Sequence, residues 1–502
     1  MKRFRAVAVV LCLLGVALPS AATIHYTVSL AEPQDHFFQV RMVVPEVKAQ
    51  LVVQLPAWNA LYQIRDFAHR VKEVRASDAG GRGVAVTKLD KQTWQVAGKG
   101  TISVEYEVFW DEGGPFASQL NANQAFINFA MILFYVPDRR SEDVSVEFAA
   151  VPEAWKIAVA LRPGPTSQSF VAGNYDALVD APAKLGNFEE FRFEAGPPEG
   201  RRANVRVAVS GDGWNRQTLE DNLRRIVAYE TQMMRDVPFD EFLFLFHFGQ
   251  GGGGMEHANS TAIGLSPGSS GSSVSAHEFF HLWNVKRIRP RSLEPVDYAR
   301  EQWTRALWFA EGVTSTYASY TLVRTGITTT RQFYDDLGVQ LTALDARPAR
   351  LWQSVEQSSL DAWHEKYGTY RRPELSISYY NKGQILGVLL DVLIRDAMDN
   401  RKSLDDVMRY LNENFAKRGR FYDDSAGIQA AAERVAGRDF ADFFRRYVAG
   451  TDELPSAEIL ALAGMKLTWR QEQRRIAEIQ ENPAATGKQR RIRDGLLKGT
   501  TD

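Results

Sequence analysis

The sequence predicts an α+β multidomain protein with an N-terminal β-sandwich, a mixed central region and a C-terminal helical region. Three observations predict this fold class. The 502 residues are too many for one ordinary hydrophobic core, so two or three domains are expected. Residues 23–195 contain short alternating segments of β-branched and aromatic residues. From residue 275 onward, apolar residues recur every three or four positions, which indicates helices.

The first 22 residues have the composition of a secretory signal peptide. Basic residues at the start precede an apolar stretch over residues 6–18, and small residues follow up to Ala22. An uncleaved membrane anchor is the alternative, but the apolar stretch is short for a bilayer. We therefore expect cleavage near Ala22, export to a bacterial periplasm or secretion, and no stable membrane insertion of the mature protein.

The predicted sandwich spans residues 23–195. Glycine-rich segments at 78–83 and 111–115 mark turns within it. The apolar run at 125–136 is too short to span a membrane and is expected to form a pair of core strands. The Pro- and Gly-rich stretch 195–200 is expected to link this domain to the next. The predicted strands have the sequences TIHYTVSL, FFQVRMVV, QLVVQL, TWQVAG, TISVEYEVFW, VSVEFAAV and FRFEA.

The remaining chain begins with mixed structure and then becomes helical. Two predicted strands, at 204–211 and 242–249, flank a predicted helix at 217–236. Clear helical patterns follow at 385–398, 403–415 and 439–450. We therefore divide this part of the chain into a domain at 200–390, a helical domain at 391–465 and a charged, weakly packed tail at 466–502.

Composition and charge exclude some classes of protein. A charged content of 24% and a formal net charge of −1 argue against a nucleic-acid partner. Cys12, within the predicted signal peptide, is the only cysteine, so the mature chain would have no disulfide bond and no thiol chemistry. Any metal site must therefore use His, Asp or Glu. The sequence leaves the oligomeric state open.

The segment HEFFH at 277–281 is the strongest chemical signal in the chain. On a helix, His277 and His281 lie four residues apart on one face, so both imidazoles can bind one zinc ion. Glu278 would then lie beside the open coordination position as a general base. A chance match containing two packed histidines is the alternative interpretation.

A catalytic zinc ion takes three protein ligands and a water molecule. Glu311 is the preferred third ligand because it lies in an apolar, helical stretch, where a buried carboxylate needs a cation or hydrogen-bond donors. Glu294, in a Pro-bounded loop, is a possible substitute. The mature chain offers no cysteine for the closed site of a structural zinc ion. We therefore expect one catalytic Zn²⁺ bound by His277, His281 and Glu311.

Several stretches resemble the glycyl aminopeptidase family of zinc metallopeptidases, which are gluzincins related to aminopeptidase N. These stretches are SAHEFFHLWNVKRIRP, ALWFAEGVTSTY, FGQGGGGMEHANST and SISYYNKGQILGVLLD, and more loosely LPAWNALYQIRDFAHRV. The resemblance implies a thermolysin-like zinc metallopeptidase domain over 200–390, with the zinc ligands and the base named above. Many members carry a PDZ domain after the catalytic part. None is expected here, because only 47 residues follow Pro455.

The resemblance also implies a substrate site. In the aminopeptidase N relatives, a Gly-x-Met-Glu-Asn strand lies along the substrate, and its glutamate holds the free α-amino group. The matching segment GGMEH makes Glu256 the amine anchor. A Tyr-x-Lys-Gly segment, whose tyrosine stabilises the oxyanion, matches YNKG and implies a catalytic Tyr380, with Tyr379 as the alternative. The other implied substrate-binding residues are Gly253, Gly254, Met255 and His257.

The glycine run at 251–254 also has a physical interpretation. Glycine loses more backbone freedom on folding than any other residue, so a run of four needs a reason. A glycine-rich edge lets a peptide backbone approach and pair with the strand, and Glu256 supplies a negative charge for a substrate ammonium group. A flexible turn is the alternative. A phosphate-binding loop is disfavoured, because no Lys-Ser or Lys-Thr follows the glycines.

We therefore expect a zinc-dependent aminopeptidase that hydrolyses the first bond of peptides with a free N-terminus, after small residues such as Gly or Ala. Zinc would activate a water molecule, Glu278 would accept its proton, and Tyr380 would stabilise the oxyanion. The alternatives are a zinc endopeptidase, a non-catalytic envelope protein that binds peptides, and a hydrolase of a non-peptide bond. Four basic side chains after HEFFH either pair with carboxylates of the substrate or the cleft, or form a solvated face or structural ion pairs: Lys286, Arg287, Arg289 and Arg291.

Overall fold

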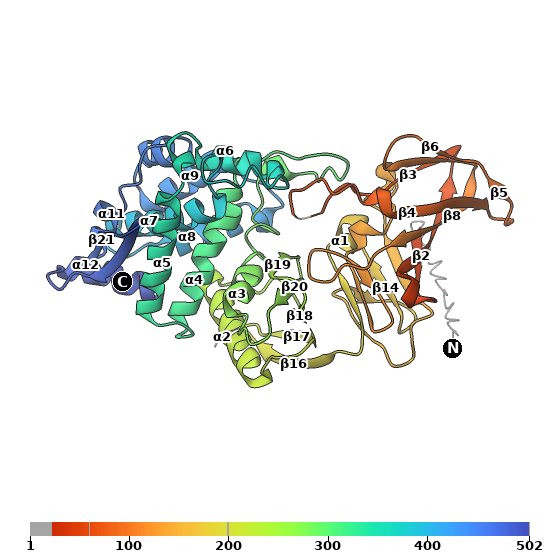
Figure 1. The fold of residues 1–502 in the computed structure, drawn as a ribbon, viewed down its shortest axis with the longest axis horizontal. Helices are drawn as coiled ribbons and strands as arrows, with labels where there is room; N and C mark the ends of the chain where they lie inside the picture. The colour runs from red at the N-terminus through yellow and green to blue at the C-terminus, as the bar shows by residue number, and fades with distance from the viewer. Residues whose placement is uncertain (1–22, 60, 198–199, 501–502) are drawn as a thin grey trace, which may run out of the picture.

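The computed structural model describes residues 23–59, 61–197 and 200–500, so the predicted signal peptide lies outside the described residues. The chain forms two lobes, a sheet-rich lobe coloured red to yellow and a larger lobe coloured green to blue (Figure 1). Each lobe has its own hydrophobic core. The sheet-rich N-terminal region and the helical C-terminal region confirm the predicted α+β class.

The N-terminal lobe is built around an eight-stranded sheet. Its strands alternate as a half-buried sheet requires: in β2, Phe38, Val40 and Met42 are buried and the residues between them are more exposed. The spatial order is β13 (Arg162–Pro163), β14 (Ser169–Ala172), β11 (Val144–Ala149), β1 (Ile24–Ser29), β2 (Phe37–Val47), β8 (Gly100–Phe109), β4 (Val71–Asp78) and β5 (Gly83–Val84).

Two smaller sheets complete this lobe. One has the order β3 (Gln50–Gln54), β7 (Thr93–Ala97) and β6 (Val86–Lys88). The other has the order β12 (Lys156–Ala158), β15 (Ala183–Gly186), β10 (Gln124–Ile127) and β9 (Gln119–Leu120), and a short helix, α1 (Tyr175–Val179), precedes β15. The expected strand pair at 125–136 is wrong in its second half. β10 is followed by a single 3-10 turn at Phe129–Met131, because a buried apolar run does not by itself require a strand.

The second lobe begins with a five-stranded sheet. Its order is β16 (Glu189–Ala195), β17 (Ala203–Ser210), β18 (Glu241–Phe248), β20 (Ser260–Leu265) and β19 (Gly253–Glu256). The three central strands are parallel, and β16 and β19 are antiparallel edges. β16 corresponds to FRFEA, which was expected in the sandwich. β16 pairs with β17, so the stretch 195–200 joins two neighbouring strands of one sheet rather than two domains, and Pro and Gly are compatible with either role.

Helices make up most of the second lobe. The Ser378 side chain caps the start of the central helix, α7, which is buried along most of its length. The helices are α2 (Arg216–Met234), α3 (Ser272–Phe280), α4 (Thr314–Arg324), α5 (Thr330–Asp345), α6 (Val355–Leu360), α7 (Tyr379–Ala397), α8 (Leu404–Asn414), α9 (Asp424–Ala436), α10 (Ala441–Phe443) and α11 (Ser456–Leu462). None of the helices in the described residues is long and apolar enough to cross a bilayer.

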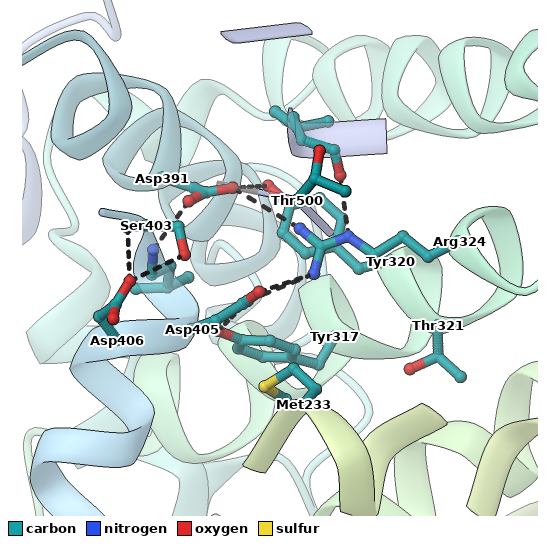
Figure 2. A network of polar contacts seen from close by, with 12 residues as sticks. Met233, Tyr317, Tyr320, Thr321, Arg324, Asp391, Ser403, Asp405, Asp406 and Thr500 are labelled. Carbon is teal, nitrogen blue, oxygen red and sulfur yellow. Dashed lines mark hydrogen bonds and ion pairs between the residues drawn. The ribbon is translucent and has the colours of Figure 1, made fainter. Parts of the chain in front are cut away.

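The C-terminal segment is folded, contrary to the expectation of a charged tail. It forms a hairpin of β21 (Met465–Gln471) and β22 (Arg475–Glu481), followed by α12 (Gly487–Lys498). Arg324 Nε donates to the Leu496 carbonyl oxygen at 2.8 Å, and Arg395 Nη1 donates to that of Thr500 at 2.8 Å. Figure 2 shows Arg324 and Thr500 near each other. These partners lie more than 100 residues away in sequence, so the charged composition gave no sign of the packing.

Candidate metal centre and substrate cleft

The end of α3 carries two facing histidines. Gly271, at φ 64°, precedes the helix, and His277 and Glu278 lie in its last turn. His281 follows directly, so the helical spacing brings the two Nε2 atoms to 3.0 Å. His281 Nδ1 donates to the Asn284 carbonyl oxygen at 2.6 Å, and His277 Nδ1 lies 3.3 Å from Ser315 Oγ. These outer contacts leave both Nε2 atoms available as ligands.

Glu311 completes the cluster from a different element. It lies in a π-helical segment, Trp308–Val313, that leads into α4. Glu311 Oε2 is 3.4 Å from His277 Nε2 and 3.2 Å from His281 Nε2. Gly312 lets this segment pack directly on α7, because a Cβ atom there would lie 2.5 Å from the Cα atom of Gly383. A π-helical turn at this position is typical of a functional site.

The three atoms fit a tetrahedral metal ion. Ligands at about 2.0–2.1 Å from zinc are separated by roughly 3.4 Å in a tetrahedron, close to the separations of 3.0–3.4 Å among these atoms. The predicted ligands His277, His281 and Glu311 are therefore brought together. Glu294, the possible substitute, instead pairs with Arg289.

The cluster has an excess of negative charge. Burial raises the pKa of Glu278 well above its usual range, and the carboxylates of Glu256 and Glu311 raise it further against the opposing effect of His281. Burial also acts to raise the pKa of Glu311, but the two histidines outweigh it and hold that pKa below its usual range. Histidines that bind a metal ion are neutral, so they would not balance the three buried carboxylates. A divalent cation is suited to this position, because it would compensate the excess of negative charge.

Glu278 packs against the glycine strand. Its Oε2 atom is buried without a hydrogen-bond partner. A Cβ atom on Gly254 would lie 2.4 Å from Glu278 Cγ and 2.5 Å from its Oε1. Only glycine at this position allows the carboxylate to occupy its place beside the strand, which is one physical reason for the glycine run.

The strand β19 (Gly253–Glu256) is the edge of its sheet, and it pairs only with β20. Its outer side can therefore accept a further extended peptide. Met255 is buried, and the Glu256 side chain has a pKa raised by burial and by Glu311, against the effects of His281 and Lys286. Glu256 lines a cavity of about 350 Å³ between the lobes, together with residues of the N-terminal lobe.

Tyr380, rather than Tyr379, faces the metal centre. Its ring centroid lies 6.2 Å from that of His277, and its side chain is 39% exposed. Tyr379 is buried behind it, with ring centroids 4.7 Å apart. Tyr380 therefore has the position expected of a group that contacts substrate.

His257 is turned toward the N-terminal lobe. Its Nδ1 atom lies 3.2 Å from Asp180, the residue that ends α1. Asp180 also accepts from the Ala258 N–H at 2.9 Å and from Lys286 Nζ at 2.6 Å. Asp180 thus ties the end of β19 and the segment after α3 to the other lobe. Sequence reasoning missed it, because nothing local distinguishes it from other acidic residues.

The remaining basic residues after α3 make structural contacts. Arg287 donates to the carbonyl oxygens of Ala258, Leu282 and Pro238. Arg291 pairs with Asp423 at 2.9 Å. The expectation of structural ion pairs is therefore correct for Lys286, Arg289 and Arg291.

Known proteins resemble this chain in sequence and in fold. The family model of the M61 glycyl aminopeptidases matches residues 271–386, and that of the M61 N-terminal domain matches residues 25–187. No curated protein matches the chain. A crystal structure of an aminopeptidase N family protein from Idiomarina loihiensis is 27% identical, with a TM-score of 0.84, and covers 89% of this chain and 79% of its own.

More distant structures share the fold. An M1 zinc metallopeptidase from Deinococcus radiodurans is 15% identical, with a TM-score of 0.54, over 87% of this chain and 95% of its own. Aminopeptidase A from Legionella pneumophila, solved with aspartic acid, is 13% identical, with a TM-score of 0.51, over 85% and 49%. The matches together support a metallo-aminopeptidase. The two family models cover more than half of the sequence, and the chain belongs to the M61 family of glycyl aminopeptidases.

Proposed function

We propose that this protein is a zinc-dependent aminopeptidase that removes small residues such as Gly or Ala from peptides with a free N-terminus. The observation that carries the proposal is the convergence of His277 Nε2, His281 Nε2 and Glu311 Oε2 within 3.0–3.4 Å of one another. A zinc ion held by these atoms would polarise the scissile carbonyl group and lower the pKa of a bound water molecule.

The protein's own side chains perform the remaining tasks. Glu256 accepts hydrogen bonds from the substrate ammonium group, and the open edge of β19 pairs with the substrate backbone. Glu278 accepts a proton from the attacking water and passes it to the leaving amine. The Tyr380 hydroxyl donates a hydrogen bond to the oxyanion that forms at the scissile carbonyl. Glu278 must be ionised to accept this proton, and a zinc ion held beside it would oppose the rise in pKa that burial causes.

The test measures release of p-nitroaniline from Gly- and Ala-p-nitroanilide, with bound zinc quantified. The same substrates with an acetylated N-terminus report endopeptidase activity. Glu256→Gln should lower kcat/KM for the free-amine substrates by about 10–100-fold, the effect of losing a hydrogen bond to a charged group. Glu301→Gln, outside the cluster, is the control and should have no effect.

Other outcomes select the alternatives. Cleavage of acetylated substrates alone would make the protein an endopeptidase, with Glu256 in another role. Absence of both zinc and cleavage would leave peptide binding as the function. Comparison of Gly and Ala with Leu and Phe p-nitroanilides tests the preference for small residues. Export is a separate proposal, and a mature N-terminus near Thr23 in mass spectrometry of the secreted protein would support it.

A further inference from the structure

A loop of the N-terminal lobe enters the core of the second lobe. The loop follows β3 and extends toward the second lobe in Figure 1, drawn in orange-red. Its base is closed where Arg65 and Asp66 both donate their N–H groups to the Ala57 carbonyl oxygen, at 2.8 and 2.9 Å. Ala57, Trp58 and Tyr62 pack in the core of the second lobe, not in that of their own lobe.

Three contacts hold this loop in place. The Ala57 N–H donates to the Tyr298 carbonyl oxygen at 2.7 Å. Trp58 Nε1 donates to the Asp297 carbonyl oxygen at 2.7 Å. Asn59 Nδ2 lies 3.8 Å from the sulfur of Met255, which immediately precedes Glu256. The loop therefore has a fixed position beside the glycine strand.

Tyr62 has an unusual conformation within this loop. Its φ angle is +49°, in the left-handed region that side chains other than glycine rarely adopt. Its ring is held from two sides, stacked on Trp58 at 6.2 Å and edge-on to Trp363 at 6.1 Å between centroids. An unfavourable backbone angle that the surroundings maintain is a mark of functional positions.

Tyr62 lies near carboxylates of the site. Burial raises the pKa of Tyr62, and the carboxylates of Glu311 and then Glu256 raise it further, so the phenol stays neutral. Tyr62 lines the same cavity as Glu256. The hydroxyl makes no hydrogen bond to another described residue, although the side chain is only 8% exposed. Its hydrogen-bonding capacity is therefore available to a ligand.

We propose that Tyr62 contacts the substrate directly, its hydroxyl accepting a hydrogen bond from the α-ammonium group that Glu256 holds. The proposal rests on the proposed function. A hydroxyl near two carboxylates lies where a positive group is most stable, and a neutral phenol oxygen can accept an N–H that Glu256 does not use. The N-terminal lobe then supplies part of the amine site, so the site is complete only when the two lobes are joined.

The test is Tyr62→Phe, which keeps the ring and removes the hydroxyl. KM for Ala-p-nitroanilide should rise about tenfold, as for the loss of a hydrogen bond to a charged group, with kcat within about twofold. Inhibition by alaninamide should weaken by the same factor. Inhibition by propionamide, which has the same shape without the amine, should not change.

The control is Tyr298→Phe. Tyr298 lines the same cavity, but its hydroxyl already donates to Asp176 at 2.9 Å, so this variant should alter KM by less than about twofold. An equal loss for propionamide, or the same change in Tyr298→Phe, would overturn the proposal in favour of altered packing. Unchanged KM and inhibition in Tyr62→Phe would overturn it outright.

The inference and the proposed function can fail separately. If the wild-type protein cleaves no aminoacyl p-nitroanilide, the proposed function fails. Calorimetry of alaninamide and propionamide binding to the wild-type protein and Tyr62→Phe then decides the role of Tyr62. Weaker binding of alaninamide alone in the variant would support the inference, and equal binding to both proteins would overturn it.

Discussion

Two buried clusters of charged side chains lie in the second lobe, and they differ in how their charges are balanced. The metal centre contains the carboxylates of Glu256, Glu278 and Glu311 with two imidazoles. The other cluster, of which Figure 2 shows Arg324, Asp391 and Asp405, contains two guanidinium groups and two carboxylates. Its members are Arg324, Arg395, Asp391 and Asp405.

The balanced cluster joins elements of the fold. Arg395 Nε donates to both oxygens of Asp391 at 3.2 and 3.1 Å, and Arg324 Nη1 lies 3.2 Å from Asp405 Oδ2. Tyr320 donates to Asp391 at 3.1 Å. Both clusters contain a buried atom without a hydrogen-bond partner, Glu278 Oε2 in one and the Nη2 atoms of Arg324 and Arg395 in the other, so the difference lies in the charge balance. The comparison teaches that opposite charges in equal number can be buried together at a cost that appears when one is removed, whereas an excess of buried carboxylates indicates a site for a cation or a ligand.

The largest effect is expected at the unbalanced cluster. Glu278→Gln removes the general base and should lower kcat by about 10²–10⁴-fold, while zinc content stays the same. The folded protein should lose no stability, because the raised pKa of Glu278 makes its ionised form unfavourable at neutral pH. Steady-state kinetics, metal analysis and thermal unfolding of the metal-free protein measure these three quantities. A lower unfolding temperature would contradict the contrast between the clusters.

The converse effect is expected at the balanced cluster. Asp391→Asn leaves two guanidinium groups facing one carboxylate and should lower the free energy of unfolding by about 3–5 kcal/mol. The folded variant should keep the kcat/KM of the wild-type protein. Denaturant unfolding and kinetics on the same samples check this. Asp396→Asn on the same helix, where a partly exposed Asp396 pairs with Lys488 at 2.8 Å, is the control and should cost about 0–1 kcal/mol.

A smaller effect is expected from the contact between Glu278 and the glycine strand. The Cβ atom in Gly254→Ala would displace the Glu278 carboxylate and should lower kcat/KM by about 100-fold, the effect of a misplacement of about 1 Å. Gly252→Ala is the matched control, since a Cβ atom there meets nothing within 4 Å. Equal activity of the two variants would show that the close approach of Gly254 to Glu278 has no role in catalysis.

The last effect, which is the smallest per pH unit, concerns a third kind of buried charge, a cation with no anion beside it in the described part of the chain. Among the described residues, Lys184, at the junction of the lobes, contacts neutral groups: Ser210 Oγ at 2.7 Å, the Phe246 carbonyl oxygen at 3.2 Å and His247 Nδ1 at 3.1 Å. Burial lowers its pKa from 10.5 to about 7. Between these values the unfolded chain binds more protons than the folded protein, so stability should rise with pH from about 7 to 10, by at most about 1.4 kcal/mol per pH unit.

Lys184→Met should remove this contribution to the pH dependence. Thermal unfolding of both proteins at pH 6–9 measures it, and the difference between their stabilities should shrink as the pH rises. A constant difference across this range would show that Lys184 keeps its ordinary pKa. The exposed substitution Lys99→Met is a control for the general effect of removing a positive charge.

Local patterns in the sequence were sufficient to predict most residues of the candidate metal centre. The spacing of His277 and His281 places both on one helical face whatever surrounds the helix, and α3 has this geometry. Glu311 followed from the cost of burying a carboxylate in an apolar run. The π-helical turn that presents it, and the packing of Gly312 on Gly383, depend on α7 and have no local signal.

Element boundaries were less predictable where the same residue composition is compatible with two different structures. The Pro- and Gly-containing stretch 195–200 joins the paired strands β16 and β17 rather than two domains, and only the pairing partner distinguishes the two roles. The charged C-terminal segment was expected to be a tail. It folds as a hairpin and a helix that contact distant elements: the Ala477 N–H of β22 donates to Thr342 of α5 at 2.9 Å, and buried arginines on α4 and α7 donate to the carbonyl oxygens of Leu496 and Thr500.

The sequence by itself determined the chemistry of this protein, because helix spacing, residue type and glycine content act over a few residues. These features include the histidine pair, the neighbouring glutamate, the glycine strand and the α+β class. The tertiary structure alone decided which distant groups complete the site. Trp58 contacts Asp297 and His257 contacts Asp180 across the two lobes, and Tyr380 rather than Tyr379 faces the histidines. Such contacts join residues far apart in the chain, so no local sequence pattern predicts them.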